Sequence, residues 1–223
     1  GSEMCIRDRF TQSMNSIIFS AQELFRYDAF LAGLASLLTC VLLVSTKKWH
    51  GGLSMDTTDG LQKFHTNPTP RIGGIAIAVG VFVGYAASSH GVAAAEKRAI
   101  LGAILLAGIP AFIFGLLEDV TKRVSVKIRL LATMASGVLG WGITGTSLTH
   151  VDIWGIDWLL SFTLISVVFT AFAVGGIANA INIIDGFNGL TAGTAVIMLA
   201  AFGFIARQVG DIPLAFTLSL IHI

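Results

Sequence analysis

The sequence predicts an all-α fold, a multi-pass bundle of transmembrane helices. Of its 223 residues, 54% are apolar and only 12% are charged, about half the charged fraction of a typical soluble domain, and the mean hydropathy is +0.81. The apolar residues form continuous runs of the ~20 residues that a helix needs to cross the bilayer, without the alternation of a barrel strand. The composition excludes a water-soluble globular protein and a disordered chain. The net charge of +1 indicates no nucleic-acid partner.

We expect six complete spans and the start of a seventh. They cover residues 29–46, 72–89, 99–117, 129–147, 158–178 and 189–206, and the seventh begins near residue 212. Glycine and proline inside these runs are compatible with helices in lipid, because neighbouring helices can satisfy the freed backbone groups. The 25 glycines also allow the helices to pack closely.

The basic residues of the loops predict how the spans are oriented. Eight lysines and arginines fall in the loops 47–71 and 118–129, which face the same side if the spans alternate. The segment 148–157, on the opposite side, contains none. Because cytoplasmic loops carry an excess of Lys and Arg, we expect the loops 47–71, 118–128 and 179–188 to be cytoplasmic and the N-terminus to lie outside.

We expect a single domain, flanked at both ends by short segments that do not belong to the natural protein. Residues 1–10 (GSEMCIRDRF) are polar and unlike the apolar runs of the rest of the chain, and residues 217–223 break off partway into a span. Both ends resemble translated adapter sequence and are set aside from fold reasoning. We therefore expect residues 11–216 to form one transmembrane domain that is incomplete at its C-terminus.

The first predicted cytoplasmic segment, residues 56–74, combines basic side chains with a sequence that cannot be helical. Pro68 and Pro70 keep the backbone extended up to the start of the second span. The basic residues near the membrane face are Lys63, His65 and Arg71. By themselves they favour a loop that lies beside anionic lipid headgroups, and a phosphate-binding entrance is the alternative.

The second segment, residues 115–129, places two adjacent carboxylates at the end of an apolar helix. Glu118 and Asp119 lie where the partial negative charge of the helix C-terminus disfavours them. Lys122 comes four residues after Glu118, a spacing that contributes only a few tenths of a kcal/mol. Paired carboxylates in such a position suggest a cation or proton role, most simply Mg²⁺ with phosphate. A solvated helix end of mixed charge is equally compatible.

The third segment, residues 175–190, repeats a polar side chain at every third position. The repeated residues are Asn179, Asn182, Asp185 and Asn188. On a helix this spacing places neighbouring members on one face, and amides in apolar surroundings need hydrogen-bond partners. Amides both donate and accept, so they suit a nucleotide base or a sugar, and Asp185 adds an anionic oxygen for a cation. Polar contacts between helices are the less favoured alternative.

Three runs in this order, KFHTNPTPRIGG, GLLEDVTKRVSVKIRLL and NAINIIDGFNGLTAG, resemble the polyprenyl-phosphate N-acetylhexosamine-1-phosphate transferase family. The resemblance covers about residues 29–215 and implies a fold of about ten membrane-spanning helices. It implies an enzyme of the bacterial inner membrane that acts at the cytoplasmic face with Mg²⁺, or with Mn²⁺ in its place. Such an enzyme transfers a sugar-1-phosphate from a UDP-N-acetylhexosamine to undecaprenyl phosphate and releases UMP. The default sugar is N-acetylglucosamine, the product begins a cell-envelope polysaccharide, and a homodimer is compatible with the family.

The resemblance also implies roles for individual residues. The implied catalytic residues are Glu118, Asp119, Asp185 and Lys63. The implied substrate-binding residues are His65, Asn179, Asn182 and Asn188, and we expect the basic residues Arg71 and Lys127 to bind substrate as well. The implied metal ligands are Glu118, Asp119 and Asp185. Two positions depart from the family: Glu118 stands where an Asp is usual, and Asn188 stands where many members have a second Asp. These departures favour the O-antigen or capsule branch over the muramoyl-pentapeptide branch.

Two motifs of the family are missing from this chain, a Phe-x-Gly-Asp-x-Gly-Ser loop and a His-x-His loop. We therefore expect the chain to be the N-terminal two-thirds of a transferase and to be inactive by itself. Two other functions stay open. In an ion-coupled transporter the three acidic residues would line an ion path, and the site would lie near the bilayer midplane. A truncated scaffold would keep the helix packing without any catalysis.

Overall fold

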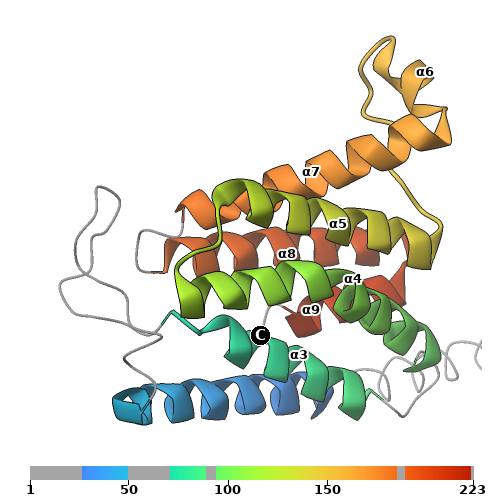
Figure 1. The fold of residues 1–223 in the computed structure, drawn as a ribbon. Helices are drawn as coiled ribbons and strands as arrows, with labels where there is room; N and C mark the ends of the chain where they lie inside the picture. Colours follow the sequence, from blue (N-terminus) through green and yellow to red (C-terminus); the bar gives the residue numbers. More distant parts are fainter. Residues whose placement is uncertain (1–26, 50–70, 89–93, 185–188, 222–223) are drawn as a thin grey trace, which may run out of the picture.

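The computed structural model describes residues 27–49, 71–88, 94–184 and 189–221, and within these ranges the chain is helical, without a β-strand. The described long helices lie side by side in a bundle, and successive helices run in opposite directions (Figure 1). In order they are Tyr27–Ser45, α3 (Gly74–Ala87), α4 (Ala94–Thr121), α5 (Val126–Thr144), α6 (Ile156–Leu160), α7 (Thr163–Ile184), α8 (Leu190–Gln208) and α9 (Ile212–Ile221).

Five of these helices are long and apolar enough to cross a membrane, namely Tyr27–Ser45, α4, α5, α7 and α8. They contain 19 to 28 residues, and at ~1.5 Å per residue even the shortest approaches the thickness of the hydrocarbon layer. Helix α3 is apolar but has only 14 residues. The prediction of a multi-pass helical membrane bundle is confirmed.

Several predicted boundaries are wrong in an informative way. The expected span 158–178 is divided, because the short helix α6 ends at Leu160 and α7 runs from Thr163 to Ile184. Residues 179–184, expected in a loop, are therefore helical. The residues between the asparagines are alanine and isoleucine, which extend the apolar surface of α7, so the isolated amides do not end the helix.

Two glycines allow α5 and α7 to approach closely. A Cβ atom built on Gly137 of α5 would lie 2.9 Å from the Cα atom of Ala171, and one built on Gly175 of α7 would lie 2.7 Å from Cγ of Met134. Neither distance is tolerated by real side chains. Small residues at such contacts are the usual means of helix association in lipid, and here they hold α7 closely against α5.

A polar contact joins α4 to α5 beside a proline. Pro110 lies inside α4, where proline disturbs the hydrogen bonding of the preceding turn. The backbone N–H of the next residue, Ala111, donates to Oγ of Ser136 on α5 at 3.1 Å. Ser136 is buried, so this bond connects the two helices in the interior of the bundle.

An ion pair in the interior joins three elements at the end of the bundle where α4 begins. Nζ of Lys97 lies 2.8 Å from Oδ2 of Asp28, and Oγ of Ser88, the residue directly after α3, donates to the same oxygen at 3.2 Å. All three side chains are buried. The pair therefore ties helix Tyr27–Ser45 and the end of α3 to α4.

We expect the Lys97→Met variant to be strongly destabilised, because it leaves the Asp28 carboxylate buried without its cation. Breaking a buried pair by removing one partner costs about 3–5 kcal/mol, measurable as a lower midpoint of thermal unfolding in detergent. Arg98→Met is the matched control, since Arg98 is exposed and lies 5.2 Å from the ring of Tyr85. Equal midpoints for the two variants would contradict a stabilising role of the pair.

Candidate functional site

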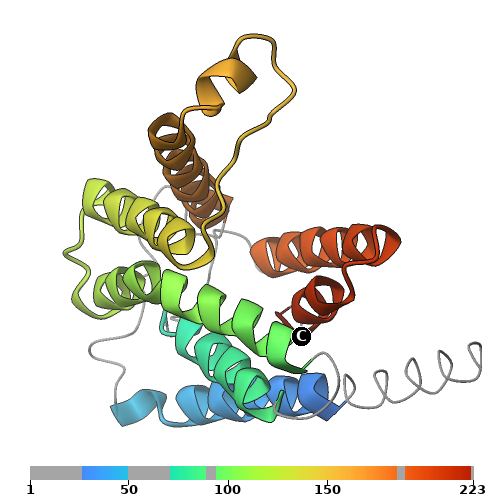
Figure 2. The ribbon, with the colours of Figure 1, turned by 90° about the vertical axis from the view of Figure 1, so that its right-hand side faces the viewer.

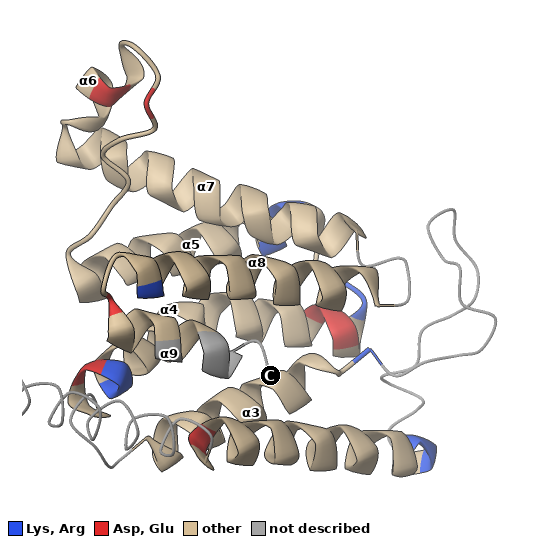
Figure 3. Ribbon diagram, turned by 180° about the vertical axis from the view of Figure 1, so that it is seen from behind, with Lys and Arg blue, Asp and Glu red and all other residues tan. Residues whose placement is uncertain are grey.

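Polar residues from four elements gather at the end of the bundle where α4 ends and α5 begins. Figure 3 shows the acidic residues of α4 at this end, close to basic residues that precede α3 and begin α5. The group consists of Arg71 before α3, Glu118 and Asp119 of α4, Arg129 of α5, and Asn179 and Asn182 of α7. We refer to these six residues as the candidate site.

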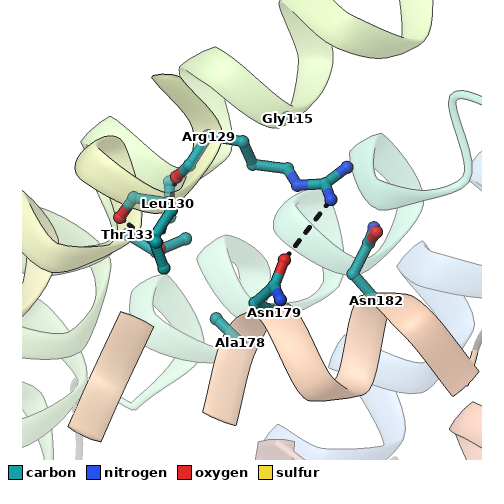
Figure 4. Close-up of a pocket in the computed structure, with 8 residues that line it drawn as sticks. Gly115, Arg129, Leu130, Thr133, Ala178, Asn179 and Asn182 are labelled. Atoms are coloured by element: carbon teal, nitrogen blue, oxygen red, sulfur yellow. Dashed lines mark hydrogen bonds between the residues drawn. The ribbon is translucent and has the colours of Figure 1, made fainter. Parts of the chain in front are cut away.

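Arg129 is the residue that connects the helices of the candidate site. Its Nη1 donates to both carboxylate oxygens of Glu118, each at 2.8 Å, and its Nη2 donates to Oδ1 of Asn179 at 3.5 Å (Figure 4). The Arg129 and Glu118 side chains are 16% and 21% exposed. A planar guanidinium with several donors suits this task, because one side chain can contact α4 and α7 together.

A sharp reversal of the chain brings Arg129 opposite Glu118. Helix α4 ends at Thr121, and Lys122 adopts the left-handed conformation with φ of 54°. Ser125 then caps α5, its side chain accepting a hydrogen bond from the backbone N–H of Ile128. Lys122 therefore lies where the chain leaves the helix, and Glu118 forms its ion pair with Arg129, eleven residues along the chain. Helical charge spacing did not predict this partner.

Asp119 faces a different neighbour. Its Oδ1 lies 3.8 Å from Nε of Arg71, and both side chains are about one third exposed, 29% and 31%. The two adjacent carboxylates of α4 thus point toward different arginines, one on α5 and one before α3. Together the four residues bring two positive and two negative charges to one end of α4.

Two small pockets lie on either side of α4 at this end. The first, of about 170 Å³, lies between α4, α5 and α7, and its polar wall consists of Arg129, Thr133, Asn179 and Asn182 (Figure 4). The second, of about 210 Å³, lies between α4 and the start of α3 and is apolar except for Asp119. Both are smaller than the ~300–1,000 Å³ of typical ligand sites, so each encloses one part of a ligand at most.

Gly115 borders both pockets. It lines both of them, together with Ala111, and a Cβ atom built on it would meet nothing within 4 Å. The small size of this residue therefore leaves space beside α4 rather than serving helix packing.

The structure brings together five of the predicted site residues, Glu118, Asp119, Arg71, Asn179 and Asn182. Lys127 is exposed on the first turn of α5 and lines neither pocket. Four others, Lys63, His65, Asp185 and Asn188, lie outside the described residues.

The sequence interpretation missed Arg129 as a site residue and treated it only as one of the loop charges. Its position in the first turn after the N-cap Ser125 was the available signal, because that turn faces the end of the preceding helix across a four-residue connection.

Glu118 and Asp119 are the two predicted metal ligands that lie within the described residues. Among the described residues, no three His, Cys, Asp or Glu side chains form a group that could hold a metal. Mg²⁺ commonly binds through one or two carboxylates, with waters and substrate phosphates as its other ligands. Glu118 and Asp119 supply carboxylate oxygens of this kind, and the third predicted ligand, Asp185, lies outside the described part.

Comparison with known proteins gives three informative relatives. A "Probable undecaprenyl-phosphate N-acetylglucosaminyl 1-phosphate transferase" of Bacillus subtilis is 32% identical over 73% of this chain and 43% of its own length. An "Undecaprenyl-phosphate alpha-N-acetylglucosaminyl 1-phosphate transferase" of Yersinia pestis is 29% identical over 69% of the chain and 40% of its own. A "Phospho-N-acetylmuramoyl-pentapeptide-transferase" of Streptococcus pyogenes is 26% identical over 64% and 45%.

The matched part of the chain spans less than half the length of these relatives. No solved structure gives a significant match. The family model described as glycosyl transferase family 4 matches residues 101–223, which is more than half of the chain and includes α5, α7 and most of α4. The chain therefore belongs to glycosyl transferase family 4.

Proposed function

We propose that this chain forms part of the cytoplasmic active site of a membrane enzyme. The enzyme transfers a sugar-1-phosphate from a UDP-sugar to undecaprenyl phosphate. The observation that carries the proposal is the meeting of Glu118, Asp119, Arg129 and two asparagines at one end of apolar, membrane-spanning helices. A lipid substrate and a water-soluble nucleotide sugar can meet only at such a boundary. The names of the relatives support the same reaction class.

The described residues supply charge and positioning for this reaction. Transfer of a phosphoryl group needs little covalent help from the protein and depends on orientation and electrostatic stabilisation. Arg129 can donate to phosphate oxygens in the strong, charge-assisted manner of a guanidinium, and Asn179 and Asn182 can bond the nucleotide in the same pocket. Mg²⁺, held by Glu118 and Asp119, would neutralise charge on the diphosphate.

No general base is required from Asp119. A phosphate monoester has its second pKa near ~6, so the lipid phosphate is largely a dianion at neutral pH and is already nucleophilic. We therefore assign Asp119 the role of a metal ligand or orienting group. Lys63, His65, Asp185 and Asn188 take the roles that the resemblance implies.

The position of the acidic residues favours a transferase over an ion-coupled transporter. Glu118 and Asp119 lie in the last turn of the 28-residue helix α4, whereas transporter sites lie near the bilayer midplane in interrupted helices. The basic residues at the same end support a cytoplasmic location. The sugar is proposed to be N-acetylglucosamine, because the two relatives named for it share 32% and 29% identity, against 26% for the muramoyl-pentapeptide transferase.

We expect Asp119→Asn in the complete polypeptide to lower UMP release by at least ~100-fold, the scale on which removal of one charge-stabilising group acts. The assay contains detergent, undecaprenyl phosphate, UDP-N-acetylglucosamine and Mg²⁺. Asp152→Asn is the matched control, because it removes the same charge in the connection between α5 and α7, at the other end of these helices. A near-normal rate for Asp119→Asn would remove this residue from the site.

We expect Gly115→Val to lower turnover strongly without unfolding the protein. The new side chain enters open space at a position that lines both pockets. Gly108→Val, two turns earlier on α4, also enters open space, but Gly108 lines neither pocket. Both variants should keep the wild-type unfolding midpoint, and only Gly115→Val should lose activity, by about tenfold or more, since small displacements of bound groups slow catalysis strongly. Equal activity of the two variants would show that the pockets hold no substrate.

A further inference from the structure

The connection between α5 and α7, residues 145–162, leaves the bundle at the end opposite the candidate site. It begins at Gly145, which ends α5 with φ of 69°, and contains the short helix α6. Figure 1 shows α6 beyond the start of α7, and in Figure 2 it lies at the top of the view, above α7 and the other helices. Because α5 and α7 both have the length and composition of membrane spans, this connection lies at a membrane boundary.

Hydrogen bonds hold this connection against the first turns of α7. Oγ of the buried Ser166 donates to the carbonyl of Leu148 at 2.7 Å, and the backbone N–H of Leu148 donates to Oγ1 of Thr170 at 2.8 Å. Further along, Oδ1 of Asp157 in α6 accepts a hydrogen bond from the N–H of Val151 at 2.8 Å. The connection is therefore a fixed structure that places α6 in a defined position.

The fixed connection displays large aromatic side chains. Trp154 is fully exposed, at 101% of its reference area, and Trp158 is 67% exposed. Trp158 also packs edge-to-face against Phe162, with 5.5 Å between ring centroids, and Phe162 is itself half exposed. Two of the four tryptophans of the chain thus lie within five residues of each other, largely uncovered by the described part of the protein.

We propose that α6 and Trp154 form an interfacial anchor, with the three aromatic side chains in the headgroup region of the leaflet opposite the candidate site. Tryptophan concentrates at this depth, because its ring is apolar and its N–H remains near water. Exposed apolar side chains also follow the aromatic ones along the chain, with Leu159 in α6 and Leu164 in the first turn of α7.

The charges of the connection indicate which lipids it contacts. Residues 145–162 contain no lysine or arginine, and their acidic residues are Asp152 and Asp157. Anchors that select anionic lipids depend on basic side chains. This anchor therefore acts through its aromatic rings and does not depend on anionic headgroups.

The proposal is tested by the fluorescence of single tryptophans in the complete polypeptide, reconstituted into phosphatidylcholine vesicles. In one variant Trp49, Trp141, Trp158 and any tryptophan outside the 223 residues are replaced by Phe, which leaves Trp154; a second variant retains only Trp158. Vesicles carry bromine on the acyl chain either close to the headgroup or close to the bilayer centre. Trp141, retained alone and located inside α5, is the matched control for a residue within a span. Unfolding midpoints equal to that of the wild type establish that each variant is folded.

We expect bromine near the headgroup to lower the emission of Trp154 and of Trp158 about twofold more than bromine at the bilayer centre, as for rings at the interface. Iodide in the water should quench them weakly, and replacing a third of the lipid by phosphatidylglycerol should change nothing. Quenching by iodide without quenching by lipid would overturn the proposal, because the rings would then project into water. Protection from both quenchers would also overturn it, because protein would cover them.

Discussion

The contact of Arg129 with Glu118 and Asn179 is the interaction on which the candidate site depends. It joins the end of α4, the start of α5 and the last turns of α7, so one side chain sets the relative positions of three helices there. It also offsets a local disadvantage, since the Glu118 carboxylate lies at the negative end of a helix dipole. Without this cation the carboxylate pair would repel the substrate phosphates that the site is proposed to bind.

The packing of the bundle supports this contact. In lipid, helices gain little from the hydrophobic effect, so close approach and polar contacts must hold them together. The glycines of α5 and α7 and the Ala111–Ser136 hydrogen bond provide both. At the other end the Asp28–Lys97 pair secures helix Tyr27–Ser45 and α3 to α4, so the two ends of the bundle are held by different polar contacts.

Much of the fold could be predicted from the sequence, because apolar runs of about 20 residues have one stable solution in a bilayer. The family could also be recognised, since its motifs are short polar segments between long apolar runs of the sequence. The helical state of Asn179 and Asn182 differs from the predicted boundary, because the span was expected to end at residue 178 and α7 continues to Ile184. The role of Arg129 was missed, since it depends on the left-handed turn at Lys122 that reverses the chain, and the spacing of Glu118 and Lys122 on a helix gave no indication of this contact.

The most direct test of the proposed function is UMP release by the complete polypeptide, measured with a panel of UDP-N-acetylsugars. Each donor is supplied with and without undecaprenyl phosphate, and with Mg²⁺ or an excess of chelator. We expect one donor, UDP-N-acetylglucosamine first among them, to give UMP only when lipid phosphate and Mg²⁺ are both present. A folded protein that releases no UMP from any donor would contradict the assignment of the Glu118, Asp119 and Arg129 site to phosphosugar transfer.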